Sequence, residues 1–181
     1  FVVGSLSALL TKSKVVGYIG GESIPPIVAV GEGFEPGVSY IDPTVKSVVS
    51  HIGSFEDAAK AKETALAMIE QGADILTANA NQAALGSIEA CKARGIKAIG
   101  IPSDQNAAGD EIIASSAEDQ PLLFSIIVKK AIDGELEPKF YELGYKDDAL
   151  HLIWNNEVET TIKDQINTII SKINSGEIVV K

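Results

Sequence analysis

The sequence predicts an α/β fold built on a doubly wound parallel sheet. A short apolar run, a polar loop and an amphipathic helix follow one another along the chain, and the pattern repeats. The stretch Gly72–Gly86, GADILTANANQAALG, contains one such unit, with an apolar run at Ala73–Thr77 and a helical pattern from Ala83 onward. Strands that are apolar on both faces are typical of a parallel sheet covered by helices. Tandem units of this kind form right-handed crossovers, so we expect a doubly wound sheet.

The repeat continues over most of the chain. A helix is expected at Asp57–Gln71, and Gly95 should end the helix that starts at Ala83. The segment 27–43 has the position of a helix between two strands, although its glycines and Pro36 argue against regular helix there. The expected strand order is 2-1-3-4-5, which makes the third strand central. The five predicted strands are Lys14–Gly20, Val45–Ile52, Ala73–Thr77, Lys97–Ile101 and Ile112–Ser116.

The repeating pattern of strand, polar loop and helix ends after Ser116. The last predicted helix carries an unbroken apolar stripe, which needs a surface to cover. Because the α/β unit from Lys14 to Ser116 would already be closed, we expect this helix and the apolar helix at the start of the chain to belong to a second lobe. The elements predicted after Ser116 are a helix at Gln120–Asp133, strands at Lys139–Tyr145 and Ala149–Trp154, and a helix at Glu157–Ser175.

Composition excludes several classes of protein. The chain has 181 residues, 45% of them hydrophobic and 22% charged, which fits a folded domain. Lys and Arg number 15 against 25 Asp and Glu, so the net charge is −10, and we expect no nucleic-acid partner. The single cysteine, Cys91, excludes an internal disulfide and is interpreted as a core thiol. No run is long enough for a transmembrane helix.

Four loops follow the predicted strands and should meet at one edge of the sheet, where ligands bind in open parallel sheets. They are Gly20–Ser23, Gly53–Glu56, Asn79–Gln82 and Pro102–Asn106. Each polar residue in them also has a structural explanation, since an Asn-rich loop caps a helix and Asp104 suits a turn. Phe55 could likewise fold onto its own helix. The candidate ligand-binding residues are Phe55, Asn79, Asn81, Gln82, Ser103 and Asp104.

The chemistry of these loops favours binding over catalysis. They contain amides, hydroxyls, carboxylates and one aromatic ring, but no Lys, Arg, His or Cys, so phosphate is a poor ligand. No G-x-G-x-x-G, P-loop or G-x-S-x-G motif is present, and no cofactor is expected. His51 and His151 have no partner at metal-ligand spacing, so no metal site is expected. Glu22 and Asp104 leave acid–base catalysis open. The inventory suits a neutral sugar or nucleoside best.

Several longer segments, taken together, resemble a known family. The segments are TKSKVVGYIGG, GFEPGVSYIDP, GSFEDAAKAKETALAMIEQGADIL, AALGSIEACKARGIKAIGIPSDQ and SKINSGEIVV. They resemble the basic membrane lipoprotein family of type I periplasmic binding proteins, whose best-understood members are purine nucleoside receptors feeding ABC transporters. The resemblance covers nearly the whole chain and implies a bilobal protein whose first third is absent here. It implies residues 1–13 as a helix of the N-terminal lobe, 14–117 as the ligand-binding C-terminal lobe, and 118–181 as a crossover with mostly N-terminal-lobe elements.

The resemblance also implies a function. It implies a solute-binding protein outside the cytoplasm, anchored by a lipid, which delivers a nucleoside-like ligand to an ABC transporter permease and catalyses no reaction. Two positions depart from the family pattern: Pro102 stands where an Asp that grips ribose is typical, and Glu118 stands where a Lys is usual. The resemblance implies a purine nucleoside or a related small neutral compound as the ligand, and the two departures leave open a different small polar molecule. The alternatives are a ligand-sensing regulatory domain of the same fold and an enzyme using Glu22 and Asp104.

Overall fold

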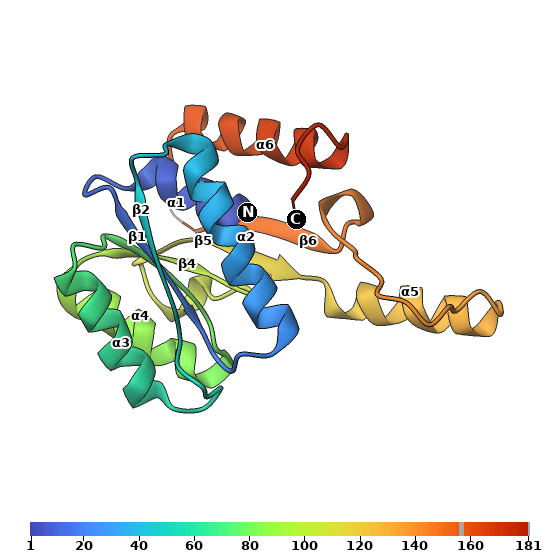
Figure 1. Cartoon of the computed structure of the whole chain (residues 1–181), viewed down its shortest axis with the longest axis horizontal. Coiled ribbons are helices and arrows are strands. Elements are labelled where there is room, and N and C mark those ends of the chain that lie inside the picture. Colours follow the sequence, from blue (N-terminus) through green and yellow to red (C-terminus); the bar gives the residue numbers. More distant parts are fainter. Residues whose placement is uncertain (156–157, 181) are drawn as a thin grey trace.

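The computed structural model describes residues 1–155 and 158–180, which form an α/β unit around one six-stranded sheet (Figure 1). The strand order is β2-β1-β3-β4-β5-β6, so the predicted order 2-1-3-4-5 is confirmed. The first five strands are parallel, and β6 joins β5 in antiparallel orientation. The strands are β1 (Val15–Gly20), β2 (Lys46–His51), β3 (Ile75–Asn79), β4 (Lys97–Gly100), β5 (Ile112–Glu118) and β6 (Leu150–Trp154).

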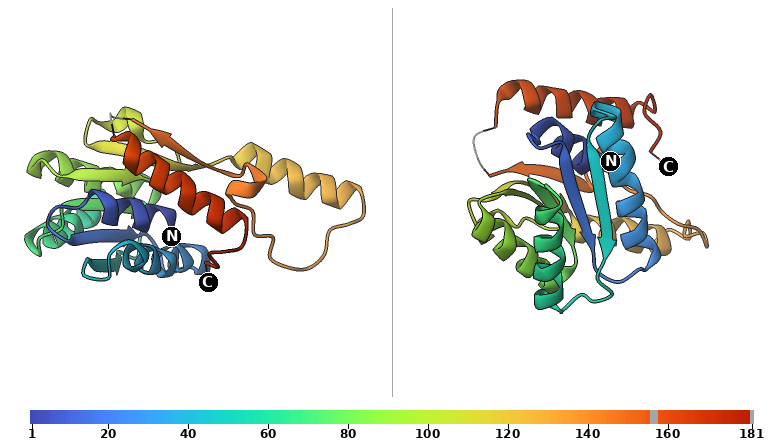
Figure 2. Two further views of the ribbon diagram at one scale, coloured as in Figure 1. Left: turned by 90° about the horizontal axis from the view of Figure 1, so that it is seen from above. Right: turned by 60° about the vertical axis from the view of Figure 1, so that its left-hand side comes forward.

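Helices cover both faces of the sheet, as the apolar strands require. On one face, α3 (Ala58–Glu70) and α4 (Ala84–Arg94) enclose a core that contains Met68, Leu76 and Ile88. On the other face, α1 (Val2–Leu10), α2 (Pro25–Ile41) and α6 (Thr160–Asn174) enclose a second core. The right-hand view of Figure 2 separates the two layers. Helix ends follow local chemistry: Asp57 caps α3 by accepting from the Lys60 amide, and Gly95 ends α4 with a φ of 65°.

Helix α2 is regular over 17 residues despite its glycines and Pro36. The reason lies in its packing against α1. A Cβ atom on Gly4 would lie 2.1 Å from the carbonyl oxygen of Phe34, so the two helix backbones are in direct contact there. The hydroxyl of Ser5 donates to the carbonyl oxygen of Gly37 across the same contact, at 3.0 Å. The small residues thus allow a close helix crossing, and packing outweighs the low helix propensity of glycine.

Three of the elements that the sequence assigns to a second lobe, α1, β6 and α6, pack onto this sheet. Strand β6 belongs to the sheet, and α1 and α6 bury Leu6 and Ile166 in the same core as Val16 of β1. The apolar stripe of α6 therefore covers the sheet face that α3 and α4 leave open. The predicted start of this helix, Glu157, lies outside the described residues.

Two other features of the C-terminal region bear on the predicted division. Helix α5 (Gln120–Ile132) extends away from the body of the molecule (Figures 1 and 2). The strand predicted at Lys139–Tyr145 is not formed, and that segment is irregular until a short 3-10 turn at Tyr145–Asp147. The assignment of α5 and the segment after it to a second lobe stays a prediction.

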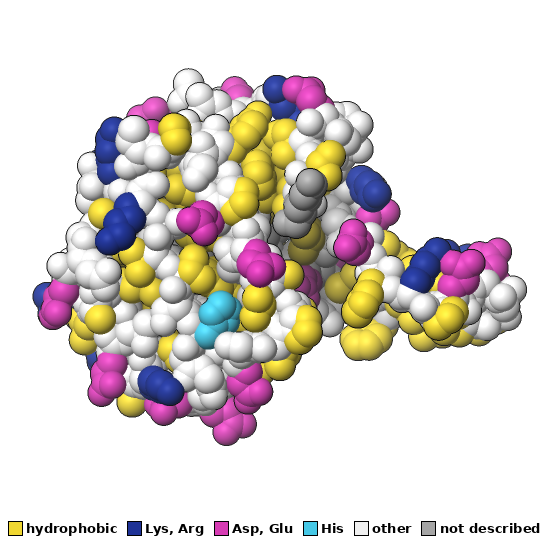
Figure 3. All heavy atoms as spheres, viewed as in Figure 1, with side chains coloured by type: hydrophobic (Ala, Val, Ile, Leu, Met, Phe, Trp, Pro, Cys, Tyr) yellow, Lys and Arg dark blue, Asp and Glu magenta, His cyan; other side chains and the backbone are white. Residues whose placement is uncertain are grey.

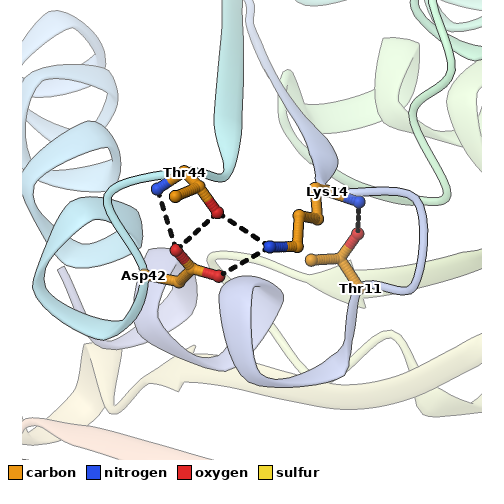
Figure 4. A network of polar contacts seen from close by, with 4 residues as sticks. All are labelled: Thr11, Lys14, Asp42 and Thr44. Carbon is orange, nitrogen blue, oxygen red and sulfur yellow. Dashed lines mark hydrogen bonds and ion pairs between the residues drawn. The ribbon is translucent and has the colours of Figure 1, made fainter.

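The amino-terminal edge of the sheet is closed by polar contacts. Lys14, just before β1, donates to the hydroxyl of Thr44 at 2.9 Å and lies 3.5 Å from a carboxylate oxygen of Asp42 (Figure 4). Thr44 donates its amide and its hydroxyl to the other oxygen of Asp42, and the Lys14 amide donates to Thr11. These contacts join the start of β1 to the start of β2, at the edge of the sheet opposite the carboxyl ends of the strands.

Candidate ligand-binding site

Backbone hydrogen bonds join the loops after β1, β2 and β3 into one rim. The amide of Gly21 donates to the carbonyl oxygen of Asn79 at 2.9 Å, and the amide of Gly53 donates to that of Gly21 at 2.9 Å. The amide of Ala83 donates to the carbonyl oxygen of Phe55 at 3.0 Å. Loops that are far apart in the sequence therefore lie in contact, as expected for the carboxyl ends of neighbouring parallel strands. We call the loops 21–24, 52–57 and 80–83 the rim.

Phe55 is half-buried on the rim, with its ring against the backbone of Gly21. A Cβ atom on Gly21 would lie 2.5 Å from two ring carbons of Phe55, so only glycine leaves room for the ring in this position. The ring thus packs across to the loop after β1, which differs from the structural alternative of folding onto its own helix. An aromatic face held in this way suits stacking against a flat ligand group.

Asn79 ends β3, and its side chain is 6% exposed. It lies on the same face of the sheet as Tyr18 of the neighbouring strand β1, because Tyr18 pairs with Thr77 and Gly20 pairs with Asn79. Burial raises the pKa of Tyr18 above its ordinary value, and the contact with Asn79 opposes this effect. Asn79 is therefore an ordered amide in a mostly buried position, which is the environment in which a side chain discriminates between hydrogen-bonding ligands.

Asn81 and Gln82 lie beside Asn79 in the short 3-10 turn Asn81–Ala83 that precedes α4. Both are exposed, and Asn81 has a φ of 48°, in the left-handed region that asparagine tolerates better than most residues. The two side chains are accessible to solvent on the rim. They do not line the buried part of the site.

Ser103 and Asp104 are exposed in the fourth loop, between β4 and β5. Asp104 accepts from the Asn106 amide at 3.0 Å, which is the turn-capping role that the sequence also allowed. No hydrogen bond joins this loop to Phe55 or Asn79 among the described residues. The loop shares the carboxyl edge because β4 pairs with β3 in parallel.

A network of amides holds the fourth loop in place. Ser115 of β5 accepts from the Gln105 amide at 3.0 Å and donates to the side chain of Asn106 at 2.8 Å. Gln105 donates to the carbonyl oxygen of Ile101, and the side-chain amide of Asn106 donates to that of Ile153 in β6 at 3.3 Å. The loop that carries Ser103 and Asp104 is thus anchored to two strands, which lowers the entropy cost of ordering it around a ligand.

A cavity of about 440 Å³ opens next to the rim, on the face covered by α1, α2 and α6. Of the six predicted residues, only Asn79 lines it. Tyr18, Ser116 and Tyr145 line it too and were missed from the sequence. The hydroxyls of Ser116 and Tyr145 lie 3.3 Å apart, and burial raises the pKa of Tyr145. Figure 3 shows hydrophobic side chains gathered around the hollow.

The residues open to catalysis or metal binding do not cluster. Within 1–155 and 158–180, no three or more His, Cys, Asp or Glu side chains are grouped so as to hold a metal ion. Glu22 and Asp104 are both exposed, on different loops. Cys91 is buried in α4, and burial raises the pKa of its thiol to about 12, which keeps it protonated and unreactive. The described helices include none long and apolar enough to cross a membrane.

The family model for ABC transporter substrate-binding proteins of the PnrA-like type, named Bmp, matches residues 1–181. The chain belongs to the Bmp family. The curated members include basic membrane protein D of Borreliella burgdorferi, which is 28% identical over 172 residues. The matched region covers 92% of this chain and 50% of the length of that protein. A purine-binding protein of Brucella abortus is 26% identical, and the match covers 98% of this chain and 51% of that protein. The nucleoside-binding protein BmpA of Lactococcus lactis is 27% identical, and the match covers 99% of this chain and 56% of that protein.

Solved structures agree with the Bmp assignment at the level of fold. An ABC transporter solute-binding protein of Aeropyrum pernix has a TM-score of 0.81 at 22% identity, covering 99% of this chain and 63% of that chain. A transcriptional activator of the comK gene from Bacillus halodurans has a TM-score of 0.82 at 25% identity, and the match covers 95% of this chain and 60% of that chain. The chain spans about half the length of the curated Bmp relatives that it matches.

Proposed function

We propose that the protein is the substrate-binding component of an ABC transporter and binds a purine nucleoside or a related small neutral compound at the rim. The observation that carries the proposal is the joined rim, which places the ring of Phe55 and the amide of Asn79 on neighbouring loops. An aromatic face and an ordered amide are the groups that a flat, hydrogen-bonding base requires. The printed functions of the Brucella and Lactococcus relatives, purine binding and nucleoside binding, support the same class.

Charge supports a neutral ligand. Acidic side chains lie on or beside the rim at Glu22, Glu56 and Asp57, and Glu118 and Glu142 line the adjacent cavity. Lys146 is the one basic residue among the described residues that line it. A phosphate would be repelled by this balance, whereas carboxylates and amides bind the hydroxyls of a sugar. In a closed, two-lobed form, Asn81, Gln82, Ser103 and Asp104 would make such contacts.

The other parts of the proposal concern the whole protein. A second lobe would close over the rim and contact the exposed side of α5, consistent with the shorter length of this chain relative to its relatives. The closed protein would be anchored outside the cytoplasm and would deliver its ligand to a permease. The protein would bind its ligand without chemical turnover.

A regulatory domain is the second candidate. The printed title of the Bacillus halodurans structure describes a transcriptional activator, so the same fold occurs in a protein described as a regulator. The rim would serve equally well as the sensor of such a protein. A DNA-binding segment elsewhere in the full-length protein would favour this alternative, and specific DNA binding by the full-length protein would establish it.

Calorimetric titration of the full-length protein with inosine, adenosine, guanosine, uridine, adenine and ribose tests the proposal. We expect a nucleoside to bind, and Phe55→Ala to weaken it about ten- to hundredfold because the stacked apolar surface is lost. Phe55→Trp is the control that keeps an aromatic face and should retain affinity. If no compound of the panel binds, or if Phe55→Ala binds as the wild type does, the proposed ligand class is wrong.

A further inference from the structure

The hydroxyls of Ser116 and Tyr145 form a pair that keeps hydrogen-bonding capacity for a third group. They lie 3.3 Å apart, which is long for a bond between two hydroxyls, and either of them can be the donor. Each hydroxyl carries one proton and accepts through its lone pairs. Since their bond uses only one of the two protons, the pair always retains one donor and free lone pairs. Neither hydroxyl makes another hydrogen bond within the described part of the chain.

The pair lies in the same row of the sheet as Asn79. Asn79 of β3 and Ser116 of β5 each come directly after a residue that pairs with Gly100 of β4. Neighbouring strands are about 4.8 Å apart, so the two positions are separated by about 10 Å across the carboxyl edge. Ile101 lies between them, and all three residues line the cavity. A nucleoside whose base contacts Asn79 is long enough to bring its sugar to Ser116.

The surroundings of the pair make it selective for a hydroxyl. The other described hydroxyl that lines the cavity, that of Tyr18, already donates to the carbonyl oxygen of Ile27 at 2.9 Å. The carboxylate of Glu118 accepts from the side-chain amide of Gln120. Most of the remaining wall is apolar and includes Leu150. A ligand hydroxyl that leaves water for this wall needs a new partner, and the pair supplies both a donor and an acceptor.

We propose that the Ser116–Tyr145 pair binds a hydroxyl of the ligand's sugar, so that the site selects a nucleoside over its free base. The proposal rests on the proposed function, because it concerns the part of the same ligand that lies beyond Asn79. The ligand hydroxyl donates to one member of the pair and accepts from the other. Ser116 belongs to β5 and Tyr145 to the turn before β6, the antiparallel partner of β5, so this end of the sheet holds both hydroxyls.

Calorimetric titration of the full-length protein with inosine and adenosine, and with their free bases hypoxanthine and adenine, tests the proposal. We expect Tyr145→Phe to weaken the binding of both nucleosides about tenfold, the effect of one lost hydrogen bond, and to leave the affinity for the free bases unchanged. Ser116→Ala should act in the same direction, and it covers the case in which Tyr145→Phe does not fold. Tyr40→Phe removes an exposed hydroxyl from α2, and this control should bind every compound as the wild type does.

The 2′-, 3′- and 5′-deoxy analogues of the two nucleosides identify the contact itself. In the wild type, one of the three should bind about tenfold more weakly than its parent, because it lacks the hydroxyl that meets the pair. In Tyr145→Phe or Ser116→Ala the same analogue should bind nearly as well as its parent, since the two changes remove one interaction. A purely structural effect of the substitutions would instead weaken all compounds by the same factor, free bases included, and would contradict the proposal.

The outcomes separate this inference from the proposed function. If the nucleosides bind the variants and the wild type equally well, the pair does not contact the sugar, and only the inference is wrong. The inference also fails if the wild type binds the free bases as tightly as the nucleosides. If neither nucleosides nor bases bind to the wild type, the proposed function and the inference are both refuted.

Discussion

At the scale of single residues, Asp74 is the carboxylate with the most hydrogen-bond donors around it at the amino-terminal edge. It accepts from the hydroxyl of Thr11 and from the backbone amides of Lys12 and Ser13 at 2.7 and 2.9 Å. Burial raises the pKa of Asp74, but these hydrogen bonds outweigh it and the pKa is lowered overall. The carboxylate therefore fastens the turn between α1 and β1 to the start of β3.

Asp74→Asn should destabilise the protein in a pH-dependent way. The lowered folded-state pKa means that ionised Asp74 contributes stability above its unfolded pKa of about 3.9, and that this contribution is lost as the pH falls through the lower folded value. We expect the free energy of unfolding of Asp74→Asn to be lower than that of the wild type by about 1.5–3 kcal/mol near neutral pH. This difference should become smaller below about pH 4. Urea denaturation across this range measures it. Asp164→Asn, at an exposed position of α6, is the control, and an equal, pH-independent cost in both variants would contradict the role of Asp74.

Sequence reasoning found the residues of the loops and missed the side chains that strands direct into the cavity. Asn79 was recognisable because it is a polar residue at the end of an apolar run. Tyr18 and Ser116 lie within or beside such runs, and a buried Tyr or Ser there is indistinguishable from core until α2 and the segment around Tyr145 are placed. Side-chain alternation puts Tyr18 and Gly20 on one face of β1, but it does not show that this face borders a cavity.

At the scale of secondary-structure elements, the crossing of α1 and α2 depends on glycine. Gly4→Ala would place a methyl group 2.1 Å from the carbonyl oxygen of Phe34, so the helices must separate. We expect the free energy of unfolding to fall by about 1–3 kcal/mol, the usual cost of overpacking. Gly33→Ala, on the facing helix, would meet its nearest atom at 3.4 Å and should be neutral or slightly stabilising. Thermal unfolding of the two variants compares them, and equal behaviour would refute the close crossing.

The elements that the sequence predicted wrongly had ambiguous local patterns. The segment Lys139–Tyr145 contains the aromatic residues Phe140, Tyr141 and Tyr145, a composition typical of strands. In the structure Phe140 is 96% exposed and no neighbouring strand pairs with the segment among the described residues, so this composition does not lead to a strand. Helix α2 was doubtful for the opposite reason, because the partner that makes its glycines favourable is α1, far away in the sequence.

At the scale of the whole molecule, α5 is the element whose apolar surface has no cover within the described chain. Phe124, Val128 and Ile132 follow one another at four-residue spacing and are 68%, 54% and 79% exposed. Figure 3 shows hydrophobic side chains along one side of this protruding part. Such a stripe in water is unfavourable, which is why we assign it to contact with a second lobe.

The apolar stripe on α5 leads to a prediction for the full-length protein. Phe124→Ser should lower its stability by about 1.5–3 kcal/mol, because the ring would lose a buried environment in the other lobe. Val179→Ser, at a position that is 72% exposed near the carboxyl end, is the matched control and should have little effect. Chemical denaturation of both variants measures the difference. If Phe124→Ser were as stable as the control, the stripe would face solvent in the full-length protein too, and the two-lobed architecture on which ligand closure depends would need another contact.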